Sequence, residues 1–421
     1  MDKLLIALIL LPIAAFGQTL EQCQHSAERN YPLIRQYDLI AKTTDLTLGN
    51  ISKNWLPQVT ASAQATLQSD VTAFPESMQS LYRQMGIDMR GLKKDQYRIG
   101  IDLQQTVYDG GAIKSQKELA RAQGEVETLQ TEVTLYQVRK RVNEMFFAIL
   151  LLDGQIQLNT DLAGLLSANE KKLQSMYEKG TAAQSDYLNI KAERLNVQQQ
   201  LESLQARRDM AAKVMSVFCG IPVTAPVKPE PAETSTAADN RPELRLFDAQ
   251  LRHADARERA LNAAILPKLG LFAQGYYGYP GMNMFEDMMR RRMSLNGLLG
   301  LRLTWNLGAL YTRHNDKAKI QLSRQSIENN RDVFLLNKSM DEITHEQNIS
   351  RFKNTLSRDD EIIALRERVR FSTESKLNHG IIDIYGLLRE INAENTAKLQ
   401  KSIHEIELLK EIYDLKFTTN N

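Results

Sequence analysis

Residues of the types that do chemistry in enzymes are scattered along this sequence. The six histidines show no spacing typical of metal ligands, and neither a nucleophile elbow nor a phosphate-binding loop is present. The histidines are His25, His253, His314, His345, His379 and His404. Gly110 and Gly111 suit a turn and do not belong to a nucleotide-binding loop. We therefore predict that the chain is not an enzyme and holds no cofactor.

Methionine gathers in two segments that we expect to be loops. Eight of the 14 methionines fall there: Met78, Met85, Met89, Met282, Met284, Met288, Met289 and Met293. Thioethers bind soft ions such as Cu(I) or Ag(I), which leaves a role in metal export open. We prefer the alternative interpretation, flexible apolar filling of the loops, and predict no metal site.

Residues 1–17 have the features of a secretory signal peptide. Lys3 precedes a short apolar run, and the small residues Ala15 and Gly17 stand before a cleavage point ahead of Gln18. The apolar run is well short of the ~20 residues that a membrane-spanning helix needs. No later stretch is long and apolar enough for such a helix, so insertion into a membrane would have to use strands.

Export would bring the two cysteines, Cys23 and Cys219, into an oxidising compartment that permits a disulfide. Two cysteines are too few for a disulfide scaffold or a cysteine zinc site. Cys23 lies near the start of the first expected helix, and Cys219 lies at the end of a later one. A disulfide between them and a pair of buried free thiols both remain open.

The overall charge of the chain argues against nucleic acid as a partner. The formal net charge is +2 with both signs interspersed, and loss of Asp2 and Lys3 with the leader leaves it unchanged. A nearly neutral chain gives no reason to expect nucleic acid. Charged residues make up 25% of the chain and the mean hydropathy is −0.38. These values are usual for membrane strands, because half of each strand is polar.

Four segments alternate between polar and apolar residues, which is typical of strands with two unlike faces. We expect these strands over about 58–68, 96–108, 268–279 and 299–307, with long loops over 69–95 and 280–295. The polar parity is our candidate pore lining: Gln58, Thr60, Gln64, Arg98, Asp102, Gln104, Lys268, Gln274, Arg302 and Thr304. The alternative is a half-buried sheet of a soluble protein, with this face in water.

Aromatic residues lie at both ends of the expected strands: Trp55, Tyr108 and Trp305 beside helices, and Tyr97, Tyr277 and Tyr279 beside loops. Two such bands are typical of the two interfaces of a bilayer. Ordinary core packing is the alternative for any one of these residues.

The second strand leads through the turn Tyr108-Asp109-Gly110-Gly111 into a proline-free helix expected over 112–179. At ~1.5 Å per residue this helix would reach about 100 Å, far longer than a globular domain needs. A return helix is expected over 185–218. A second long helix over 309–377 and a return helix to about Lys416 follow the fourth strand.

The chain repeats this plan. Pro32, within a first helix expected over 20–52, lies 25 residues before Pro57, and Pro242 lies 25 residues before Pro267. The predicted domains are a signal peptide (1–17), a first structural repeat (18–221), a linker (222–240) and a second structural repeat (241–421).

Four strands per chain cannot close a barrel, and open sheet edges are not tolerated in lipid. We therefore expect an oligomer whose strand number is a multiple of four. Two chains would give eight strands and a bore filled by side chains, whereas three would give twelve strands and room for water.

These landmarks resemble those of the TolC family of outer-membrane efflux proteins. The matching features are the helix starts at Pro32 and Pro242, the Leu-Pro strand starts at Pro57 and Pro267, the turn at 108–111, and the glycines Gly180 and Gly380. Each motif alone is loose, but their order, spacing and duplication over about 20–416 make the set specific.

The resemblance implies an α+β membrane protein. It would be a homotrimer with a twelve-stranded transmembrane β-barrel, four strands from each chain, continuous with a long periplasmic α-helical barrel. It would lie in the outer membrane of a Gram-negative bacterium, in contact with outer-membrane lipid. It would be the passive exit duct of a tripartite efflux or type I secretion system, with a periplasmic adaptor (membrane fusion protein) and an inner-membrane pump as partners.

The resemblance further implies that the tips of the helical hairpins dock the adaptor. Here the tips contain Gly180 and Thr181 in the first repeat and Gly380 and Ile381 in the second. A glycine that only ends a helix is a sufficient explanation for the glycines themselves. Exposure of Ile381 and of Ile382 would favour a partner surface.

The family's best-studied members carry aspartates six and nine residues after the second tip glycine, and these acidic rings narrow the entrance and favour cations. This chain has Gly386 and Arg389 at those positions. In the first repeat, Asp186 lies six residues after the tip glycine and so corresponds to the first of the two aspartates. Our gate candidates are Asp186 and Arg389, which could join neighbouring helices by charge-assisted hydrogen bonds and weaken a cation preference. The alternative is that Arg389 pairs with Glu390 or Glu394 on the outer face.

A different class of protein also has long periplasmic helices. A periplasmic coiled-coil adaptor or tether would contain such helices but no barrel. The four alternating segments argue against this alternative, and the lack of a catalytic constellation argues against an enzyme.

Overall fold

The computed structural model describes residues 17–231 and 240–420. The expected signal peptide, apart from its last residue, and part of the expected linker lie outside the described residues. The chain forms two compact units, and each unit takes segments from both halves of the sequence. Unit 1 contains Met1–Tyr37, Thr128–Leu246 and Asn329–Asn421, and unit 2 contains Asp38–Glu127 and Phe247–Glu328. The units therefore cut across the repeats expected from the sequence.

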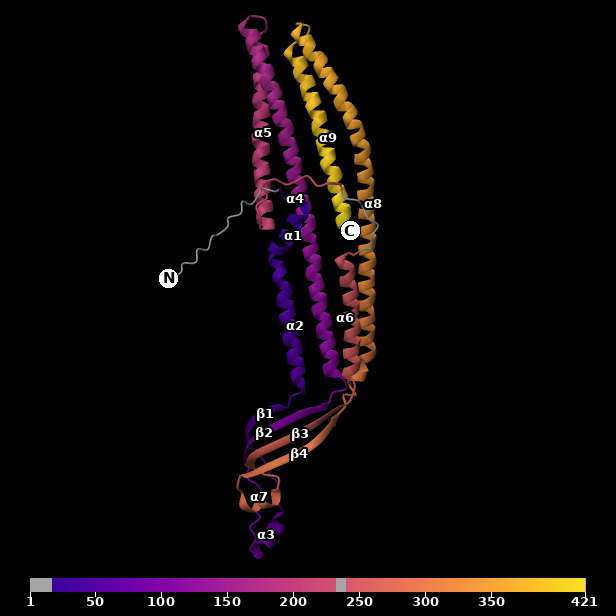
Figure 1. Ribbon diagram of the computed structural model, residues 1–421. Coiled ribbons are helices and arrows are strands. Elements are labelled where there is room, and N and C mark those ends of the chain that lie inside the picture. Colours follow the sequence, from indigo (N-terminus) through magenta and orange to yellow (C-terminus); the bar gives the residue numbers. More distant parts are fainter. Residues whose placement is uncertain (1–16, 232–239, 421) are drawn as a thin grey trace, which may run out of the picture. The chain divides into compact units, whose positions relative to one another are not determined.

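Both halves contain the same order of elements: helix, strand, short helix, strand, long helix and return helix (Figure 1). The first half contains α1 (Leu20–Asn30), η1 (Pro32–Arg35), α2 (Gln36–Ser52), η2 (Lys53–Trp55), β1 (Gln58–Leu67), α3 (Glu76–Gln84), β2 (Asp95–Tyr108), α4 (Ala112–Glu178) and α5 (Gln184–Cys219). The second half contains α6 (Pro242–Ala264), β3 (Lys268–Tyr279), α7 (Met284–Arg290), β4 (Ser294–Thr304), α8 (Ala309–Asn378) and α9 (Ile384–Thr419).

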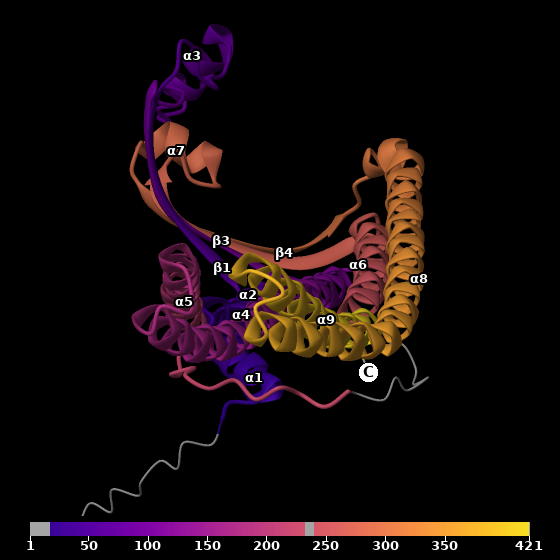
Figure 2. The ribbon, with the colours of Figure 1, turned by 90° about the horizontal axis from the view of Figure 1, so that it is seen from above.

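The sheet belongs to unit 2. Its four strands are antiparallel in the order β1-β2-β3-β4, and Figure 2 shows that they bend into a curved sheet. Among the described residues, β1 and β4 have no strand paired to their outer edges. β4 begins earlier than expected, at Ser294, and it also ends earlier, because the chain turns after Thr304. Just after the strand, the indole Nε1 of Trp305 donates to the carbonyl of Ile265 at 3.0 Å.

The two segments expected to be long loops each contain a short helix. Asn283 caps α7 by accepting a hydrogen bond from the Glu286 N–H at 3.3 Å. Asp287 accepts one from the Gly281 N–H at 2.6 Å. Tyr279 is buried beside these loops, packed with Met288 and other apolar residues. Its assignment to an interfacial aromatic band was therefore wrong, because its ring belongs to the loop core.

Helices of unit 2 are aligned by ion pairs. Arg252 of α6 contacts Glu125 of α4 at 2.6 Å, and Arg259 contacts Glu118 at 3.0 Å. The second arginine lies seven residues after the first, and the second glutamate lies seven residues before the first. This is the heptad spacing of an antiparallel helix pair. The four side chains are 32–56% exposed to solvent, so each pair contributes at most about 1 kcal/mol and mainly sets the register.

Unit 1 contains two helical hairpins, in which α5 packs back along α4 and α9 back along α8 (Figures 1 and 2). α4 has 67 residues and α8 has 70, which corresponds to about 100 Å each. Among the described residues, none of the helices carries an apolar stretch sufficient to cross a membrane.

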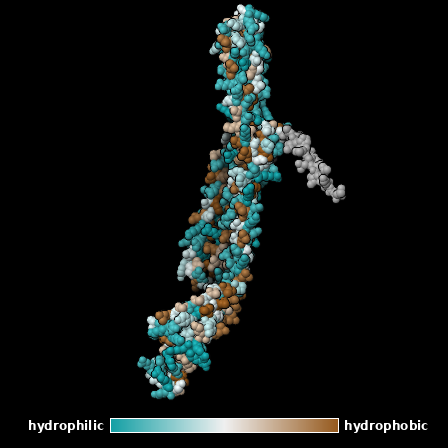
Figure 3. All heavy atoms as spheres, turned by 90° about the vertical axis from the view of Figure 1, so that its left-hand side faces the viewer, coloured by the Kyte–Doolittle hydropathy of each residue, from teal (hydrophilic) through white to brown (hydrophobic). Residues whose placement is uncertain are grey.

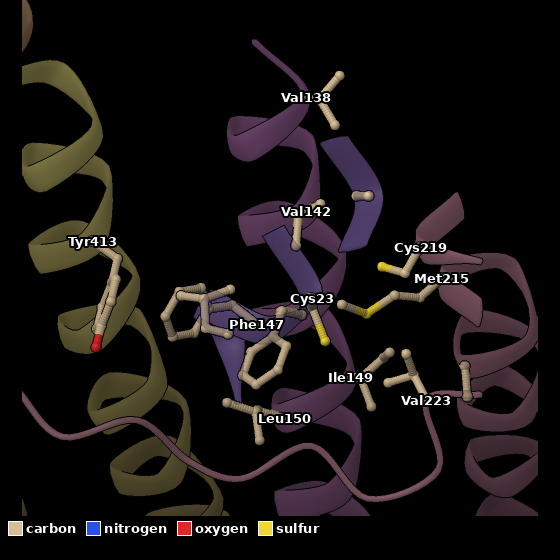
Figure 4. Close-up of a cluster of buried hydrophobic side chains, with 14 of the residues drawn as sticks. Cys23, Val138, Val142, Phe147, Ile149, Leu150, Met215, Cys219, Val223 and Tyr413 are labelled. Carbon is tan, nitrogen blue, oxygen red and sulfur yellow. The ribbon is translucent and has the colours of Figure 1, made fainter. Parts of the chain in front are cut away.

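The first helix expected from the sequence is divided near Tyr31. α1 ends at Asn30, because Pro32 restricts the preceding residue to extended backbone and cannot donate a hydrogen bond. Thr19 caps α1, accepting from the Gln22 N–H at 3.3 Å. The apolar face of α1 packs into a core shared with α4, α5 and α9, shown in Figure 4.

Candidate functional site

The pairing register separates the sheet into two faces. Gln58 pairs with Gln104, Asp102 with Gln274 and Lys268 with Thr304, so even-numbered residues of all four strands share one face up to the bulge after Thr106. We call this the polar face. It contains all ten residues predicted from the polar parity: Gln58, Thr60, Gln64, Arg98, Asp102, Gln104, Lys268, Gln274, Arg302 and Thr304. Its role in lining a pore stays a prediction.

The odd-numbered residues form an apolar face that is open to solvent in a single chain. Its exposed large side chains are Val59, Leu67, Tyr97, Ile99, Ile101, Tyr277, Leu295, Leu299, Leu301 and Leu303. Leu301 is 70% exposed. Figure 3 shows apolar side chains gathered along one side of the strands. Every lysine and arginine of the four strands lies on the polar face, so the apolar face carries no basic residue.

Two aromatic residues of the polar face were not among the residues predicted to line the pore. The guanidinium carbon of Arg98 lies 4.0 Å from the ring centre of Tyr276, and that of Arg302 lies 4.6 Å from the ring centre of Phe272. The partners of each pair lie on neighbouring strands and are offset by two residues from direct pairing. Parity alone places these rings on the polar face, but only the register shows which arginine each ring meets.

The two hairpin tips close with the same backbone hydrogen bonds. Gly180 and Gly380 both have φ of +70°. The next residue at each tip donates to a carbonyl five residues back: Thr181 to Met176 at 2.8 Å and Ile381 to Lys376 at 2.9 Å. This is the pattern of a glycine-ended helix, and a side chain at either glycine would be strained.

Both tips of unit 1 line an open groove of about 1130 Å³. Asp186, Ile381 and Ile382 are among its lining residues. Ile381 is 70% exposed, as expected for a contact surface, whereas Ile382 is half-buried. Adaptor docking at these tips stays a prediction.

The two gate candidates are not joined within one chain. Arg389 Nη2 lies 3.0 Å from Glu390 Oε1, the partner named in our alternative, and its side chain is 74% exposed. The described residues of this chain contain no ion pair between Asp186 and Arg389. A gate formed by these residues between chains stays a prediction.

Glu394, the other partner considered for Arg389, is engaged elsewhere. Its carboxylate lies 2.5 Å from Arg370 Nε and 2.7 Å from Lys398 Nζ. Burial alone would raise the pKa of Glu394, but hydrogen bonds from Lys398 and Arg370 outweigh it and lower the pKa below its usual value. The carboxylate therefore stays charged and fastens α9 to α8.

The two cysteines lie in the core of unit 1, Cys23 on α1 and Cys219 on α5, with Met215 beside them (Figure 4). Both are buried free thiols and no disulfide joins them, so of the two alternatives left open by the sequence the structure has the free thiols. A hydrogen bond with Cys219, followed by burial, raises the pKa of Cys23 far above its usual value. Cys23 is therefore held as a protonated thiol that fills the core.

The methionines of the two loop segments differ in their surroundings. Met288 is buried beside Leu92 and Tyr279, and Met89 packs against the same cluster. Met78, by contrast, is 41% exposed. Within the described residues, no group of three or more His, Cys, Asp or Glu side chains is arranged to hold a metal ion.

Comparison with known proteins extends over nearly the whole chain at low sequence identity. Neither a protein-family model nor a curated protein matches the sequence. Among solved structures, the outer-membrane channel OprN is 15% identical, with a TM-score of 0.66 over 95% of this chain and 89% of that one. The outer membrane protein VceC from Vibrio cholerae is 11% identical, with a TM-score of 0.69 over 96% of both chains.

The open state of the MtrE outer membrane channel from Neisseria gonorrhoeae is 12% identical, with a TM-score of 0.67 over 96% of this chain and 89% of that one. At these identities the likeness establishes the arrangement of the backbone. It agrees with the expectation that was based on the proline and glycine landmarks. The chain therefore has the fold of the TolC-like outer-membrane channels.

Proposed function

We propose that this chain is the outer-membrane exit duct of a tripartite efflux or type I secretion system, which passively conducts substrates to the outside. The observation that carries the proposal is a four-stranded sheet with an exposed apolar face and two edges to which no other described strand is paired. In water such a sheet would aggregate. In lipid, three copies would pair their edges into a twelve-stranded barrel with the apolar face outward and the polar face lining water.

The assembly that follows from this proposal is a homotrimer in the outer membrane of a Gram-negative bacterium. Its barrel contacts outer-membrane lipid, and α4, α5, α8 and α9 form a long periplasmic helical barrel. Helices of about 100 Å support this arrangement, because they exceed what one globular core requires. The likeness to solved outer-membrane channels also supports a duct in place of an enzyme.

Energy for transport comes from an inner-membrane pump in this proposal, and a periplasmic adaptor joins the pump to the duct. The matching glycine turns at Gly180 and Gly380, with exposed Ile381, provide the docking surface for the adaptor. Asp186 and Arg389 stand close to the tips in sequence and are the candidates for closing the gate. Single-channel recording checks this role: Arg389→Ala should raise the open probability if Arg389 closes the gate, and should change nothing if Arg389 only pairs with Glu390.

Native mass spectrometry of the protein extracted in detergent tests the duct. We expect an assembly of three chains that partitions with outer membranes and needs detergent for extraction. A stable monomer would contradict the trimer. Full recovery in the soluble fraction without detergent would instead favour the rival class, a periplasmic coiled-coil adaptor or tether.

A further inference from the structure

A specific arrangement of arginine, aromatic ring and glycine occurs between β2 and β3. Tyr276 pairs with Gly100, and a Cβ at Gly100 would lie only 2.9 Å from the Cβ of Tyr276. Glycine therefore leaves room for the tyrosine side chain against the neighbouring strand. Arg98, two residues before Gly100, covers that ring with its guanidinium carbon 4.0 Å from the ring centre. Arg98 itself pairs with a second glycine, Gly278.

The same arrangement occurs between β3 and β4. Phe272 pairs with Gly300, and a Cβ at Gly300 would lie 2.8 Å from the Cε1 and Cζ atoms of the Phe272 ring. Arg302, two residues after Gly300, has its guanidinium carbon 4.6 Å from the ring centre. It also pairs with a glycine, Gly270. We call the two arrangements the arginine shelves.

The charges of the shelves are not neutralised on the polar face. The sheet is fully described, and no ion pair is formed by Arg98 or Arg302. Asp102 is the one acidic residue on this face, and it accepts a hydrogen bond from Gln274. Lys268 adds a third positive charge. Three basic residues against one acidic residue leave a net charge of +2 on the polar face of each chain.

Stacking determines how the guanidinium groups present this charge. A guanidinium stays charged at all accessible pH values, and contact with an aromatic face holds it in place without a carboxylate. Its in-plane N–H groups remain available to a carboxylate, phosphate or sulfonate, which they can bind through bidentate hydrogen bonds. Each shelf therefore has the composition of a small anion site that is preorganised by the sheet.

We propose that the arginine shelves make the barrel section of the duct prefer anions and that its substrates include small organic anions. This inference rests on the proposed function, because three copies must first close the polar face around water. The shelves then form two rings of positive charge. Their partners on β3, Gly278 and Gly270, are eight residues apart, which is about 26 Å along the strand. This separation exceeds the Debye length of ~8 Å at physiological salt, so the rings act independently.

Reversal potentials in planar bilayers under a KCl gradient test the proposal, with the purified trimer as the channel. We expect chloride to be more permeant than potassium in the unaltered protein. Arg98→Gln and Arg302→Gln should each lower the chloride-to-potassium permeability ratio, and the double variant should lower it roughly three-fold or more. The ratio of the unaltered protein should approach one in 1 M KCl, where charges are screened within ~3 Å.

Matched lysine variants separate the effect of the positive charge from the effect of the planar guanidinium shape. Arg98→Lys with Arg302→Lys should keep the chloride preference, because the charge remains. Potassium benzoate, used as the organic anion, should reduce the chloride current through the unaltered channel and have a weaker effect on the lysine variant, which lacks the planar fork. An unaltered channel without chloride preference, or a ratio that the double glutamine variant leaves unchanged, would overturn the proposal.

The same recordings distinguish this inference from the duct on which it rests. Trimers that insert but give no conductance steps would contradict the proposed function itself. Conductance steps with an unchanged ion preference would reject only the role of the shelves. All variants are first compared for trimer yield, so that a folding defect is not mistaken for altered selectivity.

Discussion

A buried aromatic and cationic cluster joins three helical segments of unit 1. The guanidinium of Arg241 makes two hydrogen bonds to Glu243, at 2.9 and 2.6 Å, and one to the carbonyl of Phe417 at 3.1 Å. Tyr136 stacks on Phe417 with ring centres 4.5 Å apart and donates its hydroxyl proton to the same carbonyl at 2.6 Å. Each polar group of Tyr136, Arg241 and Glu243 thus has a partner, as burial requires.

Tyr136 should make stability depend on alkaline pH. Burial is the main cause that raises the pKa of Tyr136 from 10.0 to about 12. Because the folded protein holds this proton more tightly than the unfolded chain does, the stabilisation is complete below pH 10 and is lost as the pH rises toward 12. The loss is at most about 3 kcal/mol per chain.

Thermal unfolding followed by circular dichroism at pH 8, 10 and 11.5 checks this expectation. Tyr136→Phe should be less stable at pH 8 by about 1 kcal/mol, because a hydrogen bond is lost. Its deficit should shrink at pH 11.5. Tyr385→Phe is the control, because Tyr385 is 72% exposed. A deficit that is the same at every pH would show that Tyr136 does not titrate in this way.

At the scale of elements, the two hairpins share their turns but differ in how the return helix starts. Asp383 caps α9 by accepting a hydrogen bond from the Gly386 N–H at 3.0 Å. Ala183 precedes α5 and has no side chain able to do so. Since a side-chain cap stabilises a helix start by about 1 kcal/mol, the α8–α9 tip should be the more ordered of the two.

Bulky replacements at the tips test the docking surface. Gly180→Trp and Gly380→Trp should abolish export and leave trimer yield unchanged, because both glycines have open space around the Cβ position. The strain of a side chain at positive φ costs about 1–2 kcal/mol, which a long helical hairpin can tolerate. Export of a known pump substrate from cells is the measurement.

Gly164→Trp is the matched control for the tip variants. Gly164 lies within α4, away from the tip, and also has open space at its Cβ position. This variant should export normally. Full export by both tip variants would count against docking at Gly180 and Gly380.

At the scale of the whole molecule, the two faces of the sheet determine which side meets lipid. Leu298 and Leu299 are neighbours on β4 but lie on opposite faces, Leu298 on the polar face and Leu299 on the apolar face. Both are exposed in a single chain, at 47% and 69%. Solvent exposure therefore does not show which of the two leucines would meet lipid, whereas the face of the sheet on which each lies does.

Arginine at these two positions should have opposite consequences. Leu299→Arg would place a charge against lipid, at a cost of about 2–4 kcal/mol per chain near the middle of the bilayer. Leu298→Arg would place the same charge against water. We expect Leu299→Arg to reduce the yield of trimer in outer-membrane fractions and Leu298→Arg to leave it close to normal. Equal loss in both variants, or loss in Leu298→Arg alone, would contradict the assignment of the faces.

Local patterns in the sequence were sufficient to locate most elements. The helix expected over 112–179 is α4 (Ala112–Glu178), and the one expected over 185–218 is α5 (Gln184–Cys219). Helix periodicity, proline and glycine act over a few residues, so they can be interpreted without the fold. Alternation likewise assigned all ten predicted pore-lining residues to one face.

Contacts between distant segments were decided by the tertiary structure. The burial of Tyr279 and the free state of Cys23 and Cys219 both depend on which segments pack together. The arginine shelves depend on strand register: a slip of one residue between β2 and β3 would move Tyr276 to the other face, away from Arg98. The sequence by itself determined the elements and their faces, because these follow from neighbours along the chain. Only the tertiary structure decided which side chains meet, because those contacts join residues far apart along the chain, 281 positions in the case of Tyr136 and Phe417.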